Sequence, residues 1–163
     1  MSAVARRFVA QWRLRPLTAE RVAQVADVDR RAYRFPWSEA VFRDCLSAGY
    51  HGWVMLVGSG DALAGYVVLS VGAAEAHILN LCVAPEYQRR GFGRVLLKHA
   101  LDAARAMDTR VVFLEVRRSN DIAMALYRDV GFRRIGVRRG YYPDDGNRED
   151  AFVYALELGW RLR

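Results

Sequence analysis

Cysteine, proline and long apolar runs are all scarce in this chain of 163 residues, and each scarcity excludes a class of protein. The 2 cysteines, Cys45 and Cys82, lie far apart without metal-ligand spacing, which predicts neither a zinc site nor a disulfide framework. With only 4 prolines and 53% hydrophobic residues, the composition is that of a folded globule rather than a disordered chain. No apolar run approaches the roughly 18 residues of a membrane span. We therefore expect a cytoplasmic protein without a membrane segment.

Acidic residues are fewer than basic ones. The chain has 18 Asp and Glu and 25 Lys and Arg, which gives a net charge of +7. This excess favours an anionic partner such as a phosphorylated cofactor, RNA or a ribosome surface. The basic residues are spread along the chain rather than clustered with aromatic residues, so we expect no direct binding of nucleic acid. The first 17 residues hold four arginines and no acid, and we interpret residues 1–12 as a short extension before one domain at 13–160.

Hydrophobic periodicity predicts a mixed α/β order of elements. Strand, helix and strand follow one another from residue 77 to residue 116, and such a unit predicts a parallel pair with ligands at the carboxyl ends of its strands. The second strand of the pair is almost uniformly apolar, which predicts that both of its faces are covered. Thr18, Ser38 and Asn120 are candidate helix caps. The predicted strands are 12–17, 53–57, 63–71, 77–83, 111–116, 132–142 and 150–158.

The segment between the first strand of this pair and its helix reads QRRGFGR, residues 88–94. Free backbone N–H groups and the helix dipole attract an anion to the start of a helix, and glycines let a phosphate approach closely. It is neither a P-loop, which needs Gly-Lys-Ser/Thr, nor a dinucleotide fingerprint, which needs a small residue where Leu96 stands. A glycine-containing turn with solvated arginines is the alternative.

Glu115 and Tyr127 are the candidates for chemistry. A carboxylate inside an apolar strand must find partners, reach a cleft or become partly protonated, and a raised pKa would suit a general base. The alternative is a structural pair with Arg117 or Arg133. Tyr127 is a candidate acid, or else a core residue. The three histidines form no motif with one another or with a serine or cysteine, which gives little support to a hydrolase triad.

Residues 88–93 resemble the Q/R-x-x-G-x-G/A signature of the GCN5-related N-acetyltransferases (GNAT). Residues 114–120, 125–127 and 131–132 are similar to the second half of that signature. Within the family, FPWS at 35–38 and the motifs at 138–143 and 148–151 resemble the bacterial RimI type. Together the resemblance covers about residues 14–158, and separated motifs in the same order are more specific than one glycine loop.

The resemblance implies a single-domain α/β GNAT fold, with a mixed, mostly antiparallel sheet, a central parallel pair and flanking helices. It implies acetyl-CoA as cosubstrate without a metal, and transfer of acetyl to the N-terminal alanine of the eighteenth small-subunit ribosomal protein. The partner would be the basic N-terminal peptide of that protein, and we expect a monomer. The implied roles are Glu115 as base, Tyr127 as acid, Leu81, Cys82, Val83, Arg89, Arg90, Gly91, Phe92, Gly93, Arg94 and Asn120 for acetyl-CoA, and Phe35, Trp37, Tyr141 and Tyr142 for the acceptor.

Two alternatives remain open at this stage. The acceptor could be another amine, such as another protein N-terminus, a lysine, a polyamine or an aminoglycoside, or the chain could be a non-catalytic ribosome-binding module. Gly140 departs from the RimI pattern, where relatives often have a polar residue. Four acidic residues beside the two tyrosines form either a patch for an arginine-rich peptide or a solvated turn. They are Asp144, Asp145, Glu149 and Asp150.

Overall fold

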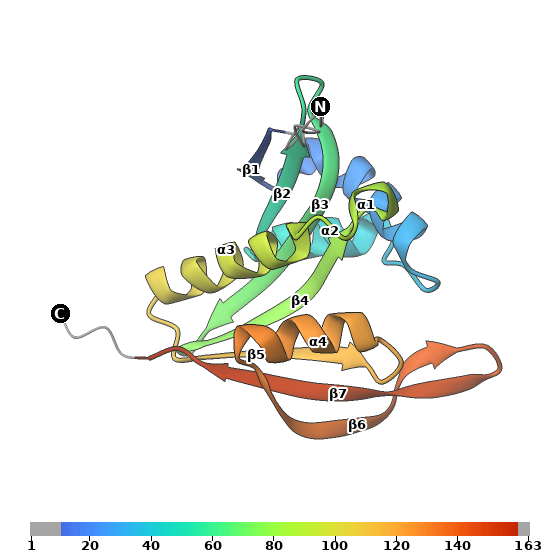
Figure 1. The fold of residues 1–163 in the computed structure, drawn as a ribbon, viewed down its shortest axis with the longest axis vertical. Helices are drawn as coiled ribbons and strands as arrows, with labels where there is room; N and C mark the ends of the chain where they lie inside the picture. The colour runs from blue at the N-terminus through green and yellow to red at the C-terminus, as the bar shows by residue number, and fades with distance from the viewer. Residues whose placement is uncertain (1–10, 160–163) are drawn as a thin grey trace, which may run out of the picture.

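A computed structural model describes residues 11–159, which form one seven-stranded sheet flanked by helices (Figure 1). The strand order is β1-β2-β3-β4-β5-β7-β6. Residues 1–10 of the predicted extension lie outside the described residues, and β1 begins at Trp12. The strands are β1 Trp12–Pro16, β2 His51–Val57, β3 Ala62–Gly72, β4 Glu75–Val83, β5 Val111–Arg117, β6 Arg133–Asp144 and β7 Asn147–Glu157. The helices are α1 Val22–Ala32, α2 Glu39–Ser47, α3 Phe92–Ala106 and α4 Asp121–Val130, with short 3-10 turns η1 Ala19–Arg21 and η2 Pro85–Tyr87.

The parallel pair predicted from the sequence is confirmed, because β4 and β5 run parallel and all other neighbours are antiparallel. Helix α3 makes the crossover between them. Their pairing ends at Ile78 opposite Leu114, although β4 continues to Val83 and β5 to Arg117. Beyond this point the two strands diverge (Figure 1). The sheet is therefore open at the carboxyl ends of its central pair.

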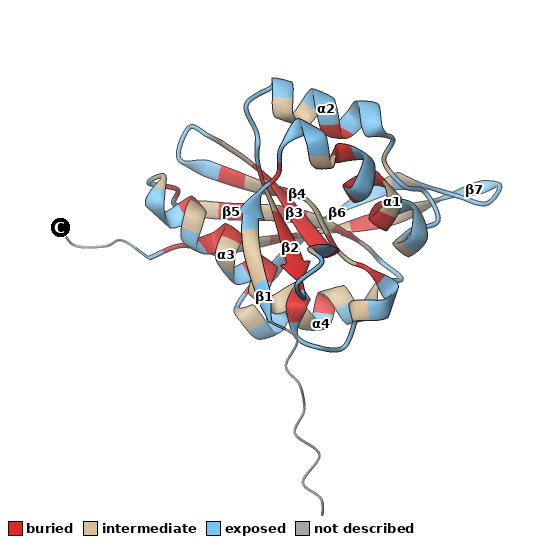
Figure 2. Cartoon of the chain, turned by 90° about the horizontal axis from the view of Figure 1, so that it is seen from above, coloured by how far each residue is buried: buried red, intermediate tan, exposed pale blue. Residues whose placement is uncertain are grey.

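The helices form two layers, with α1 and α2 on one face of the sheet and α3 and α4 on the other (Figure 2). Each layer encloses its own apolar core. Leu96, Leu97 and Ala100 of α3 are fully buried against the sheet, and Val22 and Val25 of α1 are fully buried on the opposite face. Burial of these stripes is the main favourable contribution to the fold.

Two of the three predicted helix caps are confirmed. Ser38 Oγ accepts a hydrogen bond from the Val41 amide at 3.4 Å, and Asn120 Oδ1 accepts one from the Ala123 amide at 3.2 Å. The Thr18 cap is wrong, because its hydroxyl donates to Glu20 at 3.0 Å and a 3-10 turn precedes α1. The Thr18 hydroxyl is hydrogen-bonded to the Glu20 carboxylate and accepts no hydrogen bond from a backbone N–H at the helix start.

Two details of the predicted strands are refined by the structure. β5 is covered on both faces, but one face is buried and the other is only half-buried, since its residues alternate between the two classes. The predicted loop at 143–149 is mostly strand, because β6 and β7 pair as far as Asp144 opposite Asn147. This hairpin projects into solvent, where polar side chains suit a strand as well as a loop. Among the described residues, no helix has the length and apolar character to cross a membrane.

Candidate active site

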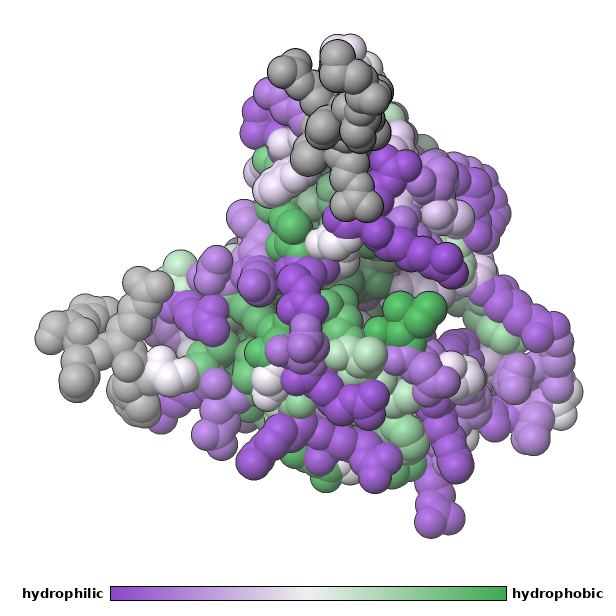
Figure 3. Space-filling view, viewed as in Figure 1, coloured by the Kyte–Doolittle hydropathy of each residue, from purple (hydrophilic) through white to green (hydrophobic). Residues whose placement is uncertain are grey.

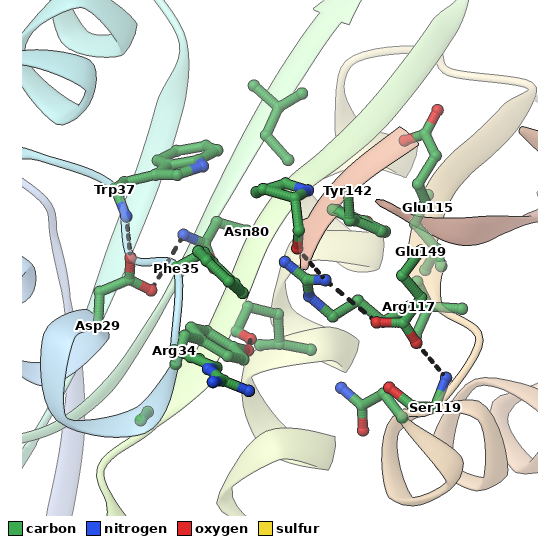
Figure 4. A pocket seen from close by; sticks show the side chains of 18 of the residues that line it. Asp29, Arg34, Phe35, Trp37, Asn80, Glu115, Arg117, Ser119, Tyr142 and Glu149 are labelled. Carbon is green, nitrogen blue, oxygen red and sulfur yellow. Dashed lines mark hydrogen bonds and ion pairs between the residues drawn. The ribbon is translucent and has the colours of Figure 1, made fainter. Parts of the chain in front are cut away.

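A cavity of about 620 Å³ occupies the opening between β4 and β5 (Figure 4). Tyr127 reaches it from α4 on one side of the sheet, and Phe35 reaches it from the α1–α2 connection on the other side. Because residues from both layers line it, the cavity passes through the sheet between the diverging strands. Leu81, Glu115, Asn120, Trp37 and Tyr142 also line it, whereas Tyr141 and loop residues 88–94 do not.

Glu115 follows directly after the last β4–β5 pair, where its side chain has a cavity on one side. Its Oε2 lies 2.5 Å from Nε2 of His77, and its Oε1 accepts a hydrogen bond from Nη1 of Arg138 at 3.1 Å. The expected alternative partners, Arg117 and Arg133, are wrong. In Figure 4 the carboxylate points away from Arg117. Glu115 is thus a carboxylate with two nitrogen partners and access to a cavity.

The pKa of Glu115 is lowered below its ordinary value. Burial acts in the opposite direction and is the largest single influence, but His77 and Arg138 together outweigh it. The expectation of a raised pKa is therefore wrong in direction, because β4 and β6 bring the side chains of His77 and Arg138 to the carboxylate. Glu115 is ionised at neutral pH and can accept a proton.

Tyr127 lies on α4 with 7% of its surface exposed, next to the rings of Phe132 and Tyr154. Burial raises the pKa of its phenol to about 12, so the hydroxyl keeps its proton at neutral pH. A buried phenol on a cavity wall is a hydrogen-bond donor for a group within that cavity. The core role and the cavity position are therefore both observed for this residue.

Arg117 connects the two sides of the cavity. Its guanidinium lies 4.5 Å from the ring of Tyr142 and 5.4 Å from that of Phe35. It donates to Glu149 at 3.1 Å, and Glu149 also accepts the Ser119 amide at 2.8 Å (Figure 4). Sequence reasoning missed this arrangement, since the partners come from segments that only the fold brings together.

Asp29 is a second carboxylate at the cavity, and only 1% of its surface is exposed. It accepts hydrogen bonds from the Trp37 amide at 2.7 Å, from Asn80 Nδ2 at 3.3 Å and from the Tyr66 hydroxyl. These bonds fix the α1–α2 connection against the sheet. A signal was present in the sequence, because an aspartate stands on the apolar stripe of α1, where an unpartnered charge would be costly.

The end of β4 offers backbone groups along the opening. The carbonyl of Leu81 accepts the Tyr33 hydroxyl at 2.7 Å, and the carbonyl of Val83 accepts Gln88 Nε2 at 3.1 Å. Cys82 is buried, and desolvation raises the pKa of its thiol to about 12. The interpretation of Cys82 as a small buried hydrophobe rather than a nucleophile is thus supported.

The loop at 88–94 forms the start of α3. Gly91 has a φ of +81°, which a glycine adopts without strain, and nothing lies within 4 Å of where its Cβ would be. No hydrogen bond within residues 11–159 uses the amides of residues 92–94. Arg90 donates to the Glu86 carbonyl at 3.3 Å, and Arg94 is paired with Asp129 of α4. The loop combines free amides with positive charge, which fits a diphosphate.

In the space-filling view, apolar side chains reach the surface between α3 and α4 within a hydrophilic surround (Figure 3). A carrier with a charged diphosphate and a less polar arm could thus meet the loop and this surface together. No group of three or more His, Cys, Asp or Glu side chains able to hold a metal occurs among the residues that the structure describes.

The predicted acidic patch is largely occupied by internal partners. Asp145 pairs with Arg34, and Asp150 accepts the amide of Gly140 at 2.9 Å. Glu149 and Asp144 line the cavity. Gly140, the departure from the RimI pattern, has a φ of +57° and lies in an irregularity of the β6–β7 pairing.

Comparison with known proteins identifies the family of this chain. The family model described as "Acetyltransferase (GNAT) family" matches residues 22–132. The chain is 39% identical over 131 residues to the [ribosomal protein bS18]-alanine N-acetyltransferase of Escherichia coli, covering 80% of this chain and 87% of that one. It is 42% identical over 128 residues to the N-alpha-acetyltransferase RimI of Mycobacterium tuberculosis, covering 76% and 77%.

A solved structure agrees with these sequence matches. The crystal structure of the ribosomal-protein-S18-alanine N-acetyltransferase from Escherichia coli superposes with a TM-score of 0.85 at 33% identity, covering 93% of this chain and 96% of that one. The predicted GNAT fold is confirmed, as is the predicted enzyme class. The chain belongs to the GNAT family of acetyltransferases, and its acetyl donor is acetyl-CoA.

Proposed function

We propose that this enzyme acetylates the N-terminal alanine of ribosomal protein bS18. The observation that carries the proposal is the 39% identity, over most of both chains, to an enzyme named for that reaction. The cavity supports it, because a carboxylate, Glu115, and a neutral phenol, Tyr127, both line it.

The ionisation of the acceptor supports an α-amine. An α-amino group with a pKa of about 7.7–8.0 is roughly one tenth neutral at pH 7, whereas a lysine near 10.4 is neutral in under about one part in a thousand. Glu115 has a lowered pKa and is a weak base. A weak base suits an amine that already loses its proton readily.

In the proposed mechanism Glu115 accepts the proton that the attacking nitrogen releases, directly or through water. Tyr127 donates a hydrogen bond, and then its proton, to the departing sulfur. Its phenol remains protonated at neutral pH because burial raises its pKa to about 12. Acetyl-CoA supplies the activated acetyl group, Glu115 is the final acceptor of the amine proton, and Tyr127 is the donor to the sulfur.

The residues assigned to acetyl-CoA fall in two groups. The backbone of Leu81, Cys82 and Val83 lies along the open end of β4 and would bind the pantetheine arm. Residues 89–94 would bind the diphosphate through free amides and arginines. Asn120 lines the cavity as a further contact, although its side-chain oxygen already caps α4.

The acceptor peptide would enter from the side of Phe35, Trp37 and Tyr142, which line the cavity. Tyr141 lies outside the cavity lining and would contact the peptide only beyond its first residues. Asp144 adds negative charge on this side, which suits a basic peptide, whereas Glu149 is already paired with Arg117. We extend the proposal in two respects. The enzyme works as a monomer in the cytoplasm and does not bind nucleic acid directly. Residues 13–160 form its domain, after an extension at residues 1–12.

Two related basic peptides test the proposal. One begins with a free alanine, followed by arginines, and the other has a blocked N-terminus and one internal lysine. We expect acetyl transfer to the first to be at least about 100-fold faster, since far more of its amine is neutral. Equal transfer to the lysine peptide or to spermidine would contradict the proposed acceptor. Mass spectrometry of bS18 from cells lacking the gene would then show an unmodified alanine.

A further inference from the structure

His77 stands beside the candidate base without lining the cavity. It lies on β4 opposite Phe113 of β5, one residue before the pairing of the two strands ends. Alternation along β5 puts Glu115 on the same face as Phe113, and therefore on the face of His77. The observed separation of Nε2 from the Glu115 Oε2 is 2.5 Å. His77 is not among the residues that line the cavity, whereas its partner Glu115 is.

The carboxylate of Glu115 is held from two strands. His77 of β4 contacts Oε2, and Arg138 of β6 donates to Oε1. Each carboxylate oxygen has more than one acceptor position, so both remain able to accept from a further group. The carboxylate is ionised at neutral pH, so the imidazole nitrogen that faces it carries hydrogen and donates.

We propose that His77 is a positioning residue for acetyl transfer, whose Nε2–H holds the Glu115 carboxylate in the orientation that accepts the proton of the attacking amine. This inference rests on the proposed role of Glu115 as base. His77 lies outside the GNAT signature motifs at 88–93 and 114–120. Its place beside Glu115 follows from the pairing of β4 with β5.

His77 is better suited to this task than Arg138. The side chain of Arg138 is 52% exposed, compared with 33% for His77, and its guanidinium also lies 4.2 Å from the ring of Tyr141. A long, exposed side chain with two partners fixes an orientation poorly. The imidazole has two rotatable bonds and is anchored on the strand next to Glu115. Loss of His77 should therefore disturb the base more than loss of Arg138.

Two nearly isosteric replacements isolate the hydrogen bond. His77→Gln keeps an N–H donor, whereas His77→Met has a similar size and no donor. We expect His77→Met to lower kcat about 10-fold or more, because a base that is no longer held in orientation misplaces the reacting groups. We expect His77→Gln to stay within about threefold of the wild type. The KM for acetyl-CoA should be unchanged in both, because His77 contacts none of the proposed cofactor residues.

A double substitution tests whether His77 acts through Glu115. If it does, His77→Met in a Glu115→Gln background should cause no further loss of kcat. His51→Ala is the matched control, because His51 is an exposed β2 histidine outside the cavity lining. Thermal unfolding and binding of coenzyme A, measured for every variant, report whether the fold is kept.

The results separate the two proposals. Wild-type kcat in His77→Met, or equal losses in His77→Met and His77→Gln, would overturn the role of His77 while the kcat of Glu115→Gln remained reduced. Multiplicative losses in the double variant would also overturn it, because His77 would then act independently of Glu115. Full activity in Glu115→Gln would instead remove the proposed base, and the role of His77 with it.

Discussion

The cavity and the loop at 88–94, which the proposed function assigns to one reaction, are built in opposite ways. In the cavity the carboxylates have partners within the protein, with Glu115 bound by His77 and Arg138 and Glu149 bound by Arg117 and Ser119. In the loop, the amides of residues 92–94 have no partner among residues 11–159. One region is complete without a ligand, and the other presents donors that a ligand would satisfy.

This difference assigns chemistry and affinity to separate regions. Side chains already fixed by hydrogen bonds need no reorganisation when the reaction occurs, which favours catalysis. Free amides and positive charge at a helix start gain hydrogen bonds when an anion arrives, which favours binding. Substitutions in the cavity should therefore change kcat, and substitutions in the loop should change the KM for acetyl-CoA.

The largest effect is expected for Tyr127→Phe. The change removes the hydroxyl and keeps the ring, so packing against Phe132 and Tyr154 is retained. We expect kcat to fall about 10²-fold or more, the scale of a lost acid catalyst, with the KM for acetyl-CoA unchanged. Steady-state kinetics at saturating peptide measure both quantities.

Tyr154→Phe is the matched control for this prediction, because Tyr154 is buried to a similar extent and does not line the cavity. Its kcat should stay near that of the wild type. Equal losses in the two variants would show that any buried phenol matters for folding rather than for chemistry. A loss confined to KM in Tyr127→Phe would contradict the separation of cavity and loop.

The same two regions differ in how far the sequence predicts them. The loop is local, since its glycines and arginines are neighbours in the chain and the following helix is evident from its apolar spacing. The partners of Glu115 are not local, because His77 lies 38 residues away and Arg138 lies 23 residues away. Which basic side chain meets Glu115 depends on strand order and register. The sequence therefore singled out Glu115 as a candidate but predicted the wrong partners and the wrong direction of its pKa.

The fold itself was largely predictable, for the same reason. The parallel pair, the caps at Ser38 and Asn120 and the order of elements follow from local periodicity and capping. The errors fall where a local rule competes with a tertiary contact. Arg117, for example, is bound by Glu149 and lies between two aromatic rings, and only the fold shows that it is unavailable to Glu115.

A smaller effect is expected for the loop arginines, and the two should differ. Arg89 has no ion pair or hydrogen bond with any described residue, whereas Arg94 is paired with Asp129. Arg89→Gln should raise the KM for acetyl-CoA about three- to tenfold, as expected for one charged hydrogen bond at an exposed site. Arg94→Gln should raise it less, because Arg94 must give up part of its pairing with Asp129 to meet a phosphate.

Asp129→Asn sharpens this comparison, since it releases Arg94 without changing the loop. We expect it to tighten binding of coenzyme A, measured by calorimetry, and to strengthen the dependence of binding on salt. Lys98, further along α3, provides the control. The substitution Lys98→Gln should leave binding of coenzyme A unchanged. Weaker binding in Asp129→Asn would contradict the idea that the Asp129 pair competes with the ligand.

The smallest expected effect concerns stability against pH in the cavity. The pKa of Glu115 is lowered from 4.5 in the folded protein, so its contribution to the free energy of unfolding is present above pH 4.5 and is lost as the pH falls through the lowered value. Glu115→Gln should therefore be less stable than the wild type at pH 7, and this difference should shrink below pH 4.5. Urea unfolding from pH 7 to pH 3 measures it, with Glu157→Gln at the exposed end of β7 as control. If the difference in unfolding free energy between the wild type and Glu115→Gln grew on acidification, the folded protein would favour the protonated carboxyl. His77 and Arg138 would then not hold Glu115 ionised before a substrate arrives.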